Sequence, residues 1–122
     1  MKVFIIEDDD IYAEFLKKSL RRKYKIHSFS NAEDSLVALK SITPDVFIID
    51  YKLPGMSGMD LYEKIKAEIN EKVKVIMLSG LDDGSLVLEF IRKGIRNYVE
   101  KDDQVIESLV AIIEDSDSYL LP

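Results

Sequence analysis

Five short apolar runs, separated by longer segments of helical period, constrain the fold of this 122-residue chain more than any other feature. The runs consist mainly of Val, Ile, Leu, Phe and Met, and they lie at 2–6, 24–29, 45–49, 73–78 and 97–100, of which 24–29 is the weakest. Continuous rather than alternating apolarity indicates strands that are buried on both faces, as in a parallel sheet covered by helices.

The segments between these runs predict helices. Apolar side chains recur at helical spacing within 11–20, 32–39, 58–69, 86–91 and 105–113. Ser30 and Glu33 have the spacing of a capping box for the second helix, and Gly94 is a natural stop for the fourth. Strict alternation with short crossovers predicts a doubly wound α/β (βα)5 sandwich, with a five-stranded parallel sheet in the order 2-1-3-4-5.

Composition narrows the class of protein. The length predicts one domain over 1–122, with no separate output domain. A net charge of −6 argues against direct nucleic-acid binding, because that binding depends on Lys and Arg neutralising phosphates. The chain has no cysteine, no apolar stretch long enough to span a membrane, and no signal-peptide pattern at its start. These features predict a cytoplasmic protein without a membrane partner.

Carboxylates follow two of the predicted strands directly. Glu7 and Asp8 come after the first strand, and Asp50 ends the third. In the order 2-1-3-4-5 these two strands are neighbours at the switch point, where ligands bind beyond the carboxyl ends. Crowded carboxylates repel unless a cation neutralises them, and oxygen ligands alone indicate Mg²⁺, with Mn²⁺ as the alternative. Asp9 and Asp10 are better explained as a solvated helix start, where the dipole favours acids.

Two further strand ends supply complementary groups. Ser79 follows the fourth apolar run and Lys101 follows the fifth, so both are expected over the same crevice. A hydroxyl and an ammonium beside a metal suit a phosphoryl group, whose charge lies on its oxygens. Each residue alone has an ordinary explanation, a turn for Ser79 and a surface lysine for Lys101. Together they indicate that Asp50 is a nucleophile and metal ligand rather than a turn former.

Four motifs in family-like order carry a resemblance over nearly the whole chain: Phe4-Ile5-Ile6-Glu7-Asp8-Asp9, Asp50 to Gly58, Leu78-Ser79-Gly80 and Tyr98-Val99-Glu100-Lys101. As a set they resemble the flavodoxin-like receiver domain of two-component response regulators, of the chemotaxis-regulator kind. The resemblance implies that Asp50 accepts a phosphoryl group from the phosphohistidine of a sensor histidine kinase or phosphotransfer protein. It implies Mg²⁺ ligation by Glu7, Asp8, Asp50 and the backbone carbonyl of Lys52. Ser79 and Lys101 would bind the phosphoryl group, and Ser79 and Tyr98 would act as the switch.

One departure from the family pattern concerns the loop after Lys101. Asp102 stands where a proline in a cis peptide is common, and a non-proline cis bond costs roughly 2.5–4 kcal/mol, so the geometry of this peptide is left open. The segment Leu86–Ile91 is apolar on more than one helical face, which predicts a surface for a downstream protein or a homodimer.

Two other functions compete with the receiver. A haloacid dehalogenase-like phosphatase also uses an Asp nucleophile and Mg²⁺, but it needs a second acid two positions later, where this chain has Lys52. A receiver-like binding module without phosphorylation is disfavoured, because every reactive position is filled. As a receiver, the domain would catalyse its own modification at Asp50 rather than turn over external substrates.

Overall fold

Parallel strands and helices alternate along the chain in the computed structural model, which describes residues 1–69, 72–80 and 85–115. Within these ranges the strands are β1 (Lys2–Ile6), β2 (Lys25–Phe29), β3 (Val46–Asp50), β4 (Lys74–Ser79) and β5 (Asn97–Glu100). They form one parallel sheet in the order β2-β1-β3-β4-β5. The predicted fold class and strand order are therefore confirmed.

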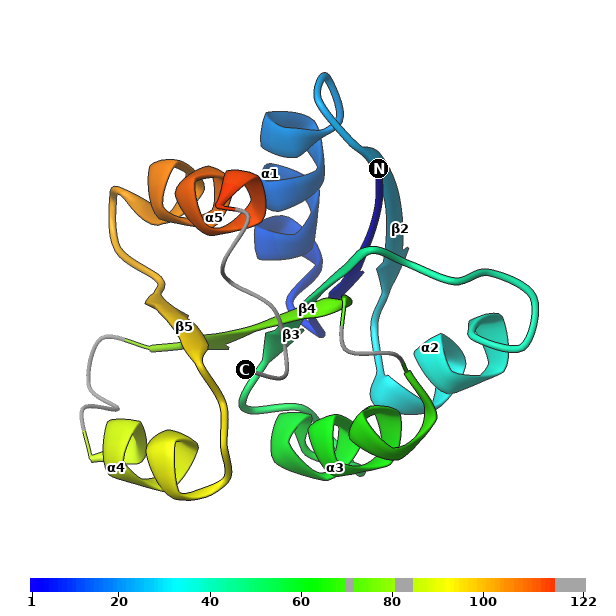
Figure 1. The fold of residues 1–122 in the computed structure, drawn as a ribbon. Helices are drawn as coiled ribbons and strands as arrows, with labels where there is room; N and C mark the ends of the chain where they lie inside the picture. The colour runs from blue at the N-terminus through cyan, green and yellow to red at the C-terminus, as the bar shows by residue number, and fades with distance from the viewer. Residues whose placement is uncertain (70–71, 81–84, 116–122) are drawn as a thin grey trace.

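Helices cover both faces of this sheet. On one face lie α1 (Asp10–Leu20) and α5 (Val105–Glu114); on the other lie α2 (Ala32–Ala38), α3 (Gly58–Glu68) and α4 (Leu86–Arg92) (Figure 1). Every residue of β3 and β4 is buried, which explains why their sequences are apolar without alternation. In the part of the chain that is described, no helix has the length and apolarity needed to cross a bilayer.

The start of α2 differs from the sequence prediction. The helix begins at Ala32 with Asn31 as its N-cap, and the Asn31 side chain accepts a hydrogen bond from the Asp34 backbone N–H at 2.8 Å. The capping box predicted on Ser30 and Glu33 is therefore wrong by one residue. Asn and Ser are comparable N-caps, so the sequence offered two adjacent candidates and the backbone path selected the second.

Candidate functional site

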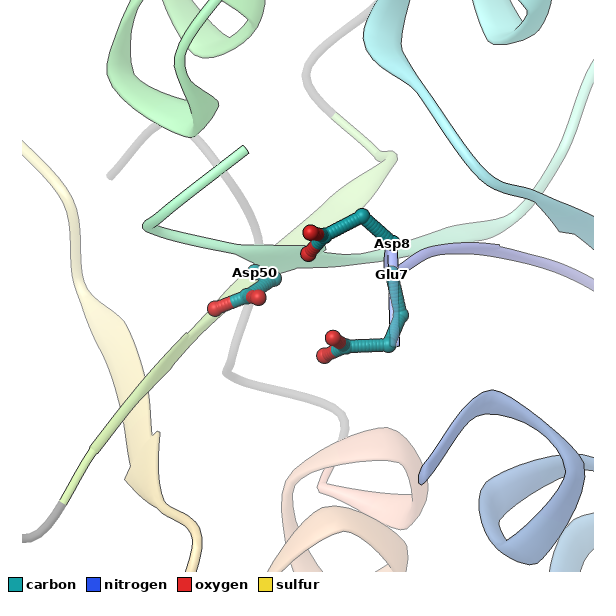
Figure 2. Close-up of side chains that lie close together, drawn as sticks. All are labelled: Glu7, Asp8 and Asp50. Atoms are coloured by element: carbon teal, nitrogen blue, oxygen red, sulfur yellow. The ribbon is translucent and has the colours of Figure 1, made fainter. Parts of the chain in front are cut away.

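The crevice lies at the carboxyl ends of β1 and β3. The two strands are paired, with Ile6 opposite Ile49, so the residues that come next emerge at the same sheet edge. Carboxylate oxygens of Glu7, Asp8 and Asp50 all lie within 4.8 Å of one another, and Figure 2 shows the three side chains facing a common space. Glu7 and Asp50 are only 1% and 6% exposed, whereas Asp8 is open to solvent. The structure thus brings together the three carboxylates predicted at the strand ends.

Backbone contacts fix the position of Asp50. The Tyr51 N–H donates to the Leu78 carbonyl at 2.9 Å, and the Lys52 N–H donates to Asp50 Oδ1 at 3.3 Å. The first turn of α3 packs directly against this strand end, since a Cβ added to Gly58 would lie 2.3 Å from the Asp50 carbonyl oxygen. Only glycine allows this approach. The Asp50 carboxylate is therefore held at a strand end by backbone contacts rather than carried on a free loop.

Lys101 places its ammonium between two of the carboxylates. Its Nζ lies 2.7 Å from Glu7 Oε2 and 3.3 Å from Asp50 Oδ2, although Lys101 and Glu7 are 94 residues apart in sequence. The Lys101 backbone N–H donates to the Ser79 carbonyl at 2.9 Å, which anchors this residue to the end of β4. The described residues contain no cis peptide bond, so the Lys101–Asp102 peptide, left open by the sequence, is trans.

Burial and charge shift the protonation of this pair. Burial raises the pKa of Glu7 to about 7, an effect that the Lys101 hydrogen bond opposes and the Asp50 charge reinforces. Burial lowers the pKa of Lys101, but the Glu7 hydrogen bond and the negative charge of Asp50 outweigh it, so that pKa is raised. Lys101 therefore stays cationic at neutral pH. One ammonium against three carboxylates leaves an excess of negative charge in the crevice.

The donor set fits a hard divalent cation. The three clustered side chains all offer carboxylate oxygens, the excess charge is negative, and the exposed Asp8 leaves the position open to water. Asp9 is not in this cluster. Its side chain accepts from the Ile11 and Tyr12 backbone N–H groups at 3.0 and 3.1 Å as the N-cap of α1, which is the helix-start role expected for it.

Ser79 and Tyr98 lie on the two strands beyond β3, on β4 and β5 respectively. Ser79 ends β4 and is buried, one strand away from Asp50. Tyr98 lies on β5, is 38% exposed, and is not in the acidic cluster. Its ring centroid lies 5.8 Å from that of Phe90, which lies 5.7 Å from that of Tyr51. A row of aromatic rings therefore joins the residue after Asp50 to Tyr98.

The sequence did not reveal three of these neighbours: Tyr51, Phe90 and Tyr12. Phe90 belonged to a segment predicted to be partly exposed, but it is fully buried. Tyr12 lies in the first turn of α1, close in sequence to Glu7 and Asp8, and its ring lies beneath the Lys101 ammonium. Only the closeness of Tyr12 to these acids in sequence offered a signal, and it indicates no chemistry until Lys101 is placed beside the ring.

Removing Asp8 is expected to abolish the stabilisation of the protein by Mg²⁺. A cation that binds only the folded state at about ten times its dissociation constant adds about 1.4 kcal/mol to the free energy of unfolding. We expect this gain for the wild type and almost none for Asp8→Asn, measured by urea unfolding with Mg²⁺ and with EDTA. Asp9→Asn is the matched control, because it removes a neighbouring charge and keeps a good N-cap. Equal stabilisation of both variants would show that Asp8 is not a ligand.

Comparison with known proteins gives a consistent assignment. The family model of the response regulator receiver domain matches residues 3–114. A chemotaxis protein CheY from Listeria monocytogenes is 28% identical over 115 residues, which cover 89% of this chain and 96% of that protein. A cyclic di-GMP phosphodiesterase from Thermotoga maritima is 31% identical over 102 residues, which are 83% of this chain but only 27% of the relative. The match to that relative therefore covers about a quarter of its length.

The fold comparison agrees. The BeF3-activated receiver domain of DrrB superposes with a TM-score of 0.79 at 26% identity, covering 93% of each chain. A putative response regulator from Chloroflexus aurantiacus gives the same TM-score and identity, covering 92% of this chain and 95% of that one. With the strand order and the acidic strand ends described above, these matches show that the chain belongs to the response regulator receiver domain family of two-component signalling.

Proposed function

We propose that residues 1–122 act as one phosphoacceptor domain in which Asp50 receives a phosphoryl group from a phosphohistidine. One observation carries this proposal: the Asp50 carboxylate lies at a buried strand end, 3.3 Å from the Lys101 ammonium and beside two further carboxylates. That arrangement provides a nucleophile, a fixed positive charge and a cation site in one crevice. These are the parts that phosphoryl transfer requires.

Receiver domains generally bind Mg²⁺ at an acidic pocket, and here Glu7, Asp8 and Asp50 would hold it together with the Lys52 backbone carbonyl, with Mn²⁺ as a substitute. When bound, the cation neutralises charge on the phosphoryl oxygens and on the carboxylates. The hydrogen bond from the Asp9 N–H to Glu7 Oε1, at 3.1 Å, keeps the Glu7 carboxylate oriented within the crevice. The ligand set therefore needs little rearrangement to accept a cation.

Transfer needs only positioning and charge stabilisation from the protein. A carboxylate oxygen of Asp50 attacks phosphorus in line as the bond from phosphorus to the histidine nitrogen breaks. Lys101 already points at Asp50, so its ammonium meets the phosphoryl oxygens without reorganisation. The Ser79 hydroxyl, at the next strand end, then gains a charged acceptor. The domain thereby catalyses its own modification.

Phosphorylation of Asp50 would change the surface formed by α4 and β5. Drawing Ser79 toward a phosphoryl oxygen changes the end of β4, whose neighbour β5 carries Tyr98. Leu88 and Ile91, in the predicted Leu86–Ile91 surface, are 62% and 61% exposed on α4, and Phe90 beneath them contacts the Tyr98 ring. This surface would bind a downstream protein or a second copy of the domain once Tyr98 changes its position.

The upstream partner would be a sensor histidine kinase or a phosphotransfer protein. Receiver domains act with such partners, and relatives of this chain carry output functions outside the matched segment. A cytoplasmic location follows from the proposal, because histidine kinases make phosphohistidine from ATP. The diesterase activity named for one relative is not proposed for this chain, since the chain spans only 27% of that protein.

Intact-mass measurement after incubation with phosphoramidate and Mg²⁺ tests the proposed function. We expect a single added phosphoryl group on the wild type and none on Asp50→Asn. Uptake by Asp50→Asn, or no uptake by the wild type, would contradict the proposal. Steady hydrolysis of organic phosphates would instead support the phosphatase. In the same samples, amide NMR shifts of Leu88, Ile91 and Tyr98 should change on phosphorylation, and unchanged shifts would contradict the output surface.

A further inference from the structure

Among the described residues, Tyr12 is the one aromatic side chain whose ring face lies beneath the Lys101 ammonium. Lys101 Nζ lies 4.6 Å from the centroid of the Tyr12 ring, within the range of a cation–π contact. Tyr12 sits in the first turn of α1, shortly after Glu7 and Asp8, and its ring packs against the core formed by β1, β3, α1 and α5. The ring is therefore held by the sandwich itself rather than by the loop.

We infer that the Tyr12 ring is a positioning residue for phosphoryl transfer, holding the Lys101 ammonium over Asp50. This inference rests on the proposed function, because it assigns a task within that reaction. Lysine has a flexible four-carbon stem and loses rotamer freedom whenever its ammonium is held in one place. Glu7 and Asp50 contact the Lys101 ammonium from within the crevice, and the Tyr12 ring face contacts it from another direction.

Acidic residues next to Lys101 explain why its ammonium needs the contact with the Tyr12 ring. Asp102 and Asp103 follow Lys101 directly, and both are exposed. Their carboxylates attract the Lys101 ammonium outward into solvent, away from Asp50. The Lys101 side chain is 21% exposed, which leaves a route outward. A ring face that attracts the cation favours the inward rotamer before the phosphoryl group arrives. Such preorganisation is the main source of rate in a charge-stabilised transfer.

The Tyr12 hydroxyl is not what the contact uses. Its oxygen is buried and has no hydrogen-bond partner. An unpaired buried hydroxyl is a cost to the folded state rather than a gain. Removing the hydroxyl while keeping the ring should therefore leave the position of Lys101 unchanged. Tyr12→Phe and Tyr12→Leu consequently separate the two parts of the side chain.

The first test measures phosphorylation by phosphoramidate at saturating Mg²⁺. We expect Tyr12→Phe to react within about 2-fold of the wild type and Tyr12→Leu to react about 3- to 30-fold more slowly, the range from an exposed to a desolvated cation–π contact. Tyr12→Met, another unbranched helix former, replaces Tyr12→Leu if the latter unfolds. A Tyr12→Leu or Tyr12→Met rate equal to the wild type, or a Tyr12→Phe rate as slow as theirs, would overturn the inference.

The second test shows whether Tyr12 acts through Lys101. In a Lys101→Met background, adding Tyr12→Leu should change the rate by less than about 2-fold, because the cation that the ring holds is gone. A further slowing comparable to that in the wild-type background would overturn the inference, since it would mean that the ring affects the reaction in another way.

The third test does not depend on phosphorylation. A ring face shields protons that lie over it, so the Lys101 ε-methylene protons should resonate upfield in the unmodified wild type and in Tyr12→Phe. They should return toward ordinary lysine positions in Tyr12→Leu. Identical shifts in all three proteins would overturn the inference even if phosphorylation proceeds. An upfield shift in a wild-type protein that takes up no phosphoryl group would instead refute the proposed function and leave the contact in place.

Discussion

Lys101→Met is expected to slow phosphorylation of Asp50 by about 10²- to 10³-fold at saturating Mg²⁺, the usual effect of removing one preorganised charge from a transition state. The ammonium lies 3.3 Å from Asp50 Oδ2, so on the proposed function it would contact the phosphoryl oxygens where charge develops. Methionine keeps much of the length and apolar character of the side chain and removes only the charge. The rate is measured by intact mass at intervals after phosphoramidate is added.

Two controls define the origin of this effect. Lys93→Met removes the same charge from an exposed position at the end of α4 and should leave the rate unchanged. Lys101→Arg keeps the charge but replaces a compact ammonium with a planar fork, so we expect only partial activity. If Lys101→Met and Lys93→Met react equally fast, Lys101 does not act on the phosphoryl group. Its contacts with Glu7 and Asp50 would then be structural only.

Gly58→Ala is expected to lower the free energy of unfolding by about 2–3 kcal/mol, the upper part of the range for overpacking. On an ordinary helix this substitution stabilises by up to about 1 kcal/mol, so the sign is reversed here. The added Cβ would lie 2.3 Å from the Asp50 carbonyl oxygen and 3.0 Å from Tyr51 Cα. Both atoms belong to backbone, so relief requires moving the end of β3. Phosphorylation should slow as Asp50 is displaced, with stability measured by urea unfolding.

Gly94→Ala is the matched control for this prediction. Gly94 has a φ of +84°, so alanine there is strained, but its Cβ meets nothing closer than 3.7 Å. We expect a loss of about 1–2 kcal/mol from the backbone strain alone and no change in the phosphorylation rate. If Gly58→Ala were as stable as the wild type and equally reactive, the close approach of α3 to Asp50 would have no functional importance.

Part of the site was predictable because it depends on strand ends. Apolar runs that stop at Glu7 and at Asp50 place carboxylates at one edge once the strand order is known. The alternation of strands and helices leaves two common orders, of which 2-1-3-4-5 suits five strands better. The helix-start role of Asp9 was equally local, and hydrogen bonds to Ile11 and Tyr12 show it. The wrong cap at Ser30 marks the limit of local patterns, since Asn31 fits the same motif one residue later.

The aromatic contacts were not predictable in the same way. Phe90 belongs to an apolar segment whose sequence fits several helical faces, and only packing decides that it is buried between Tyr51 and Tyr98 while Leu88 and Ile91 are exposed. A helical period gives the angle between side chains on one helix, but it does not give the angle of that helix to the sheet. The row of rings beside Asp50 therefore depends on the tertiary arrangement.

The sequence alone determined the sandwich, the strand order and the acids at two strand ends, because local periodicity and chain connectivity leave few alternatives. The tertiary structure decided which groups touch: Lys101 against Glu7, the Lys101 ammonium over the Tyr12 ring, and Gly58 against the Asp50 carbonyl. Contacts between residues up to 94 positions apart depend on how helices settle on the sheet to within an ångström. That fit results from side-chain packing over the whole core, which no local pattern encodes.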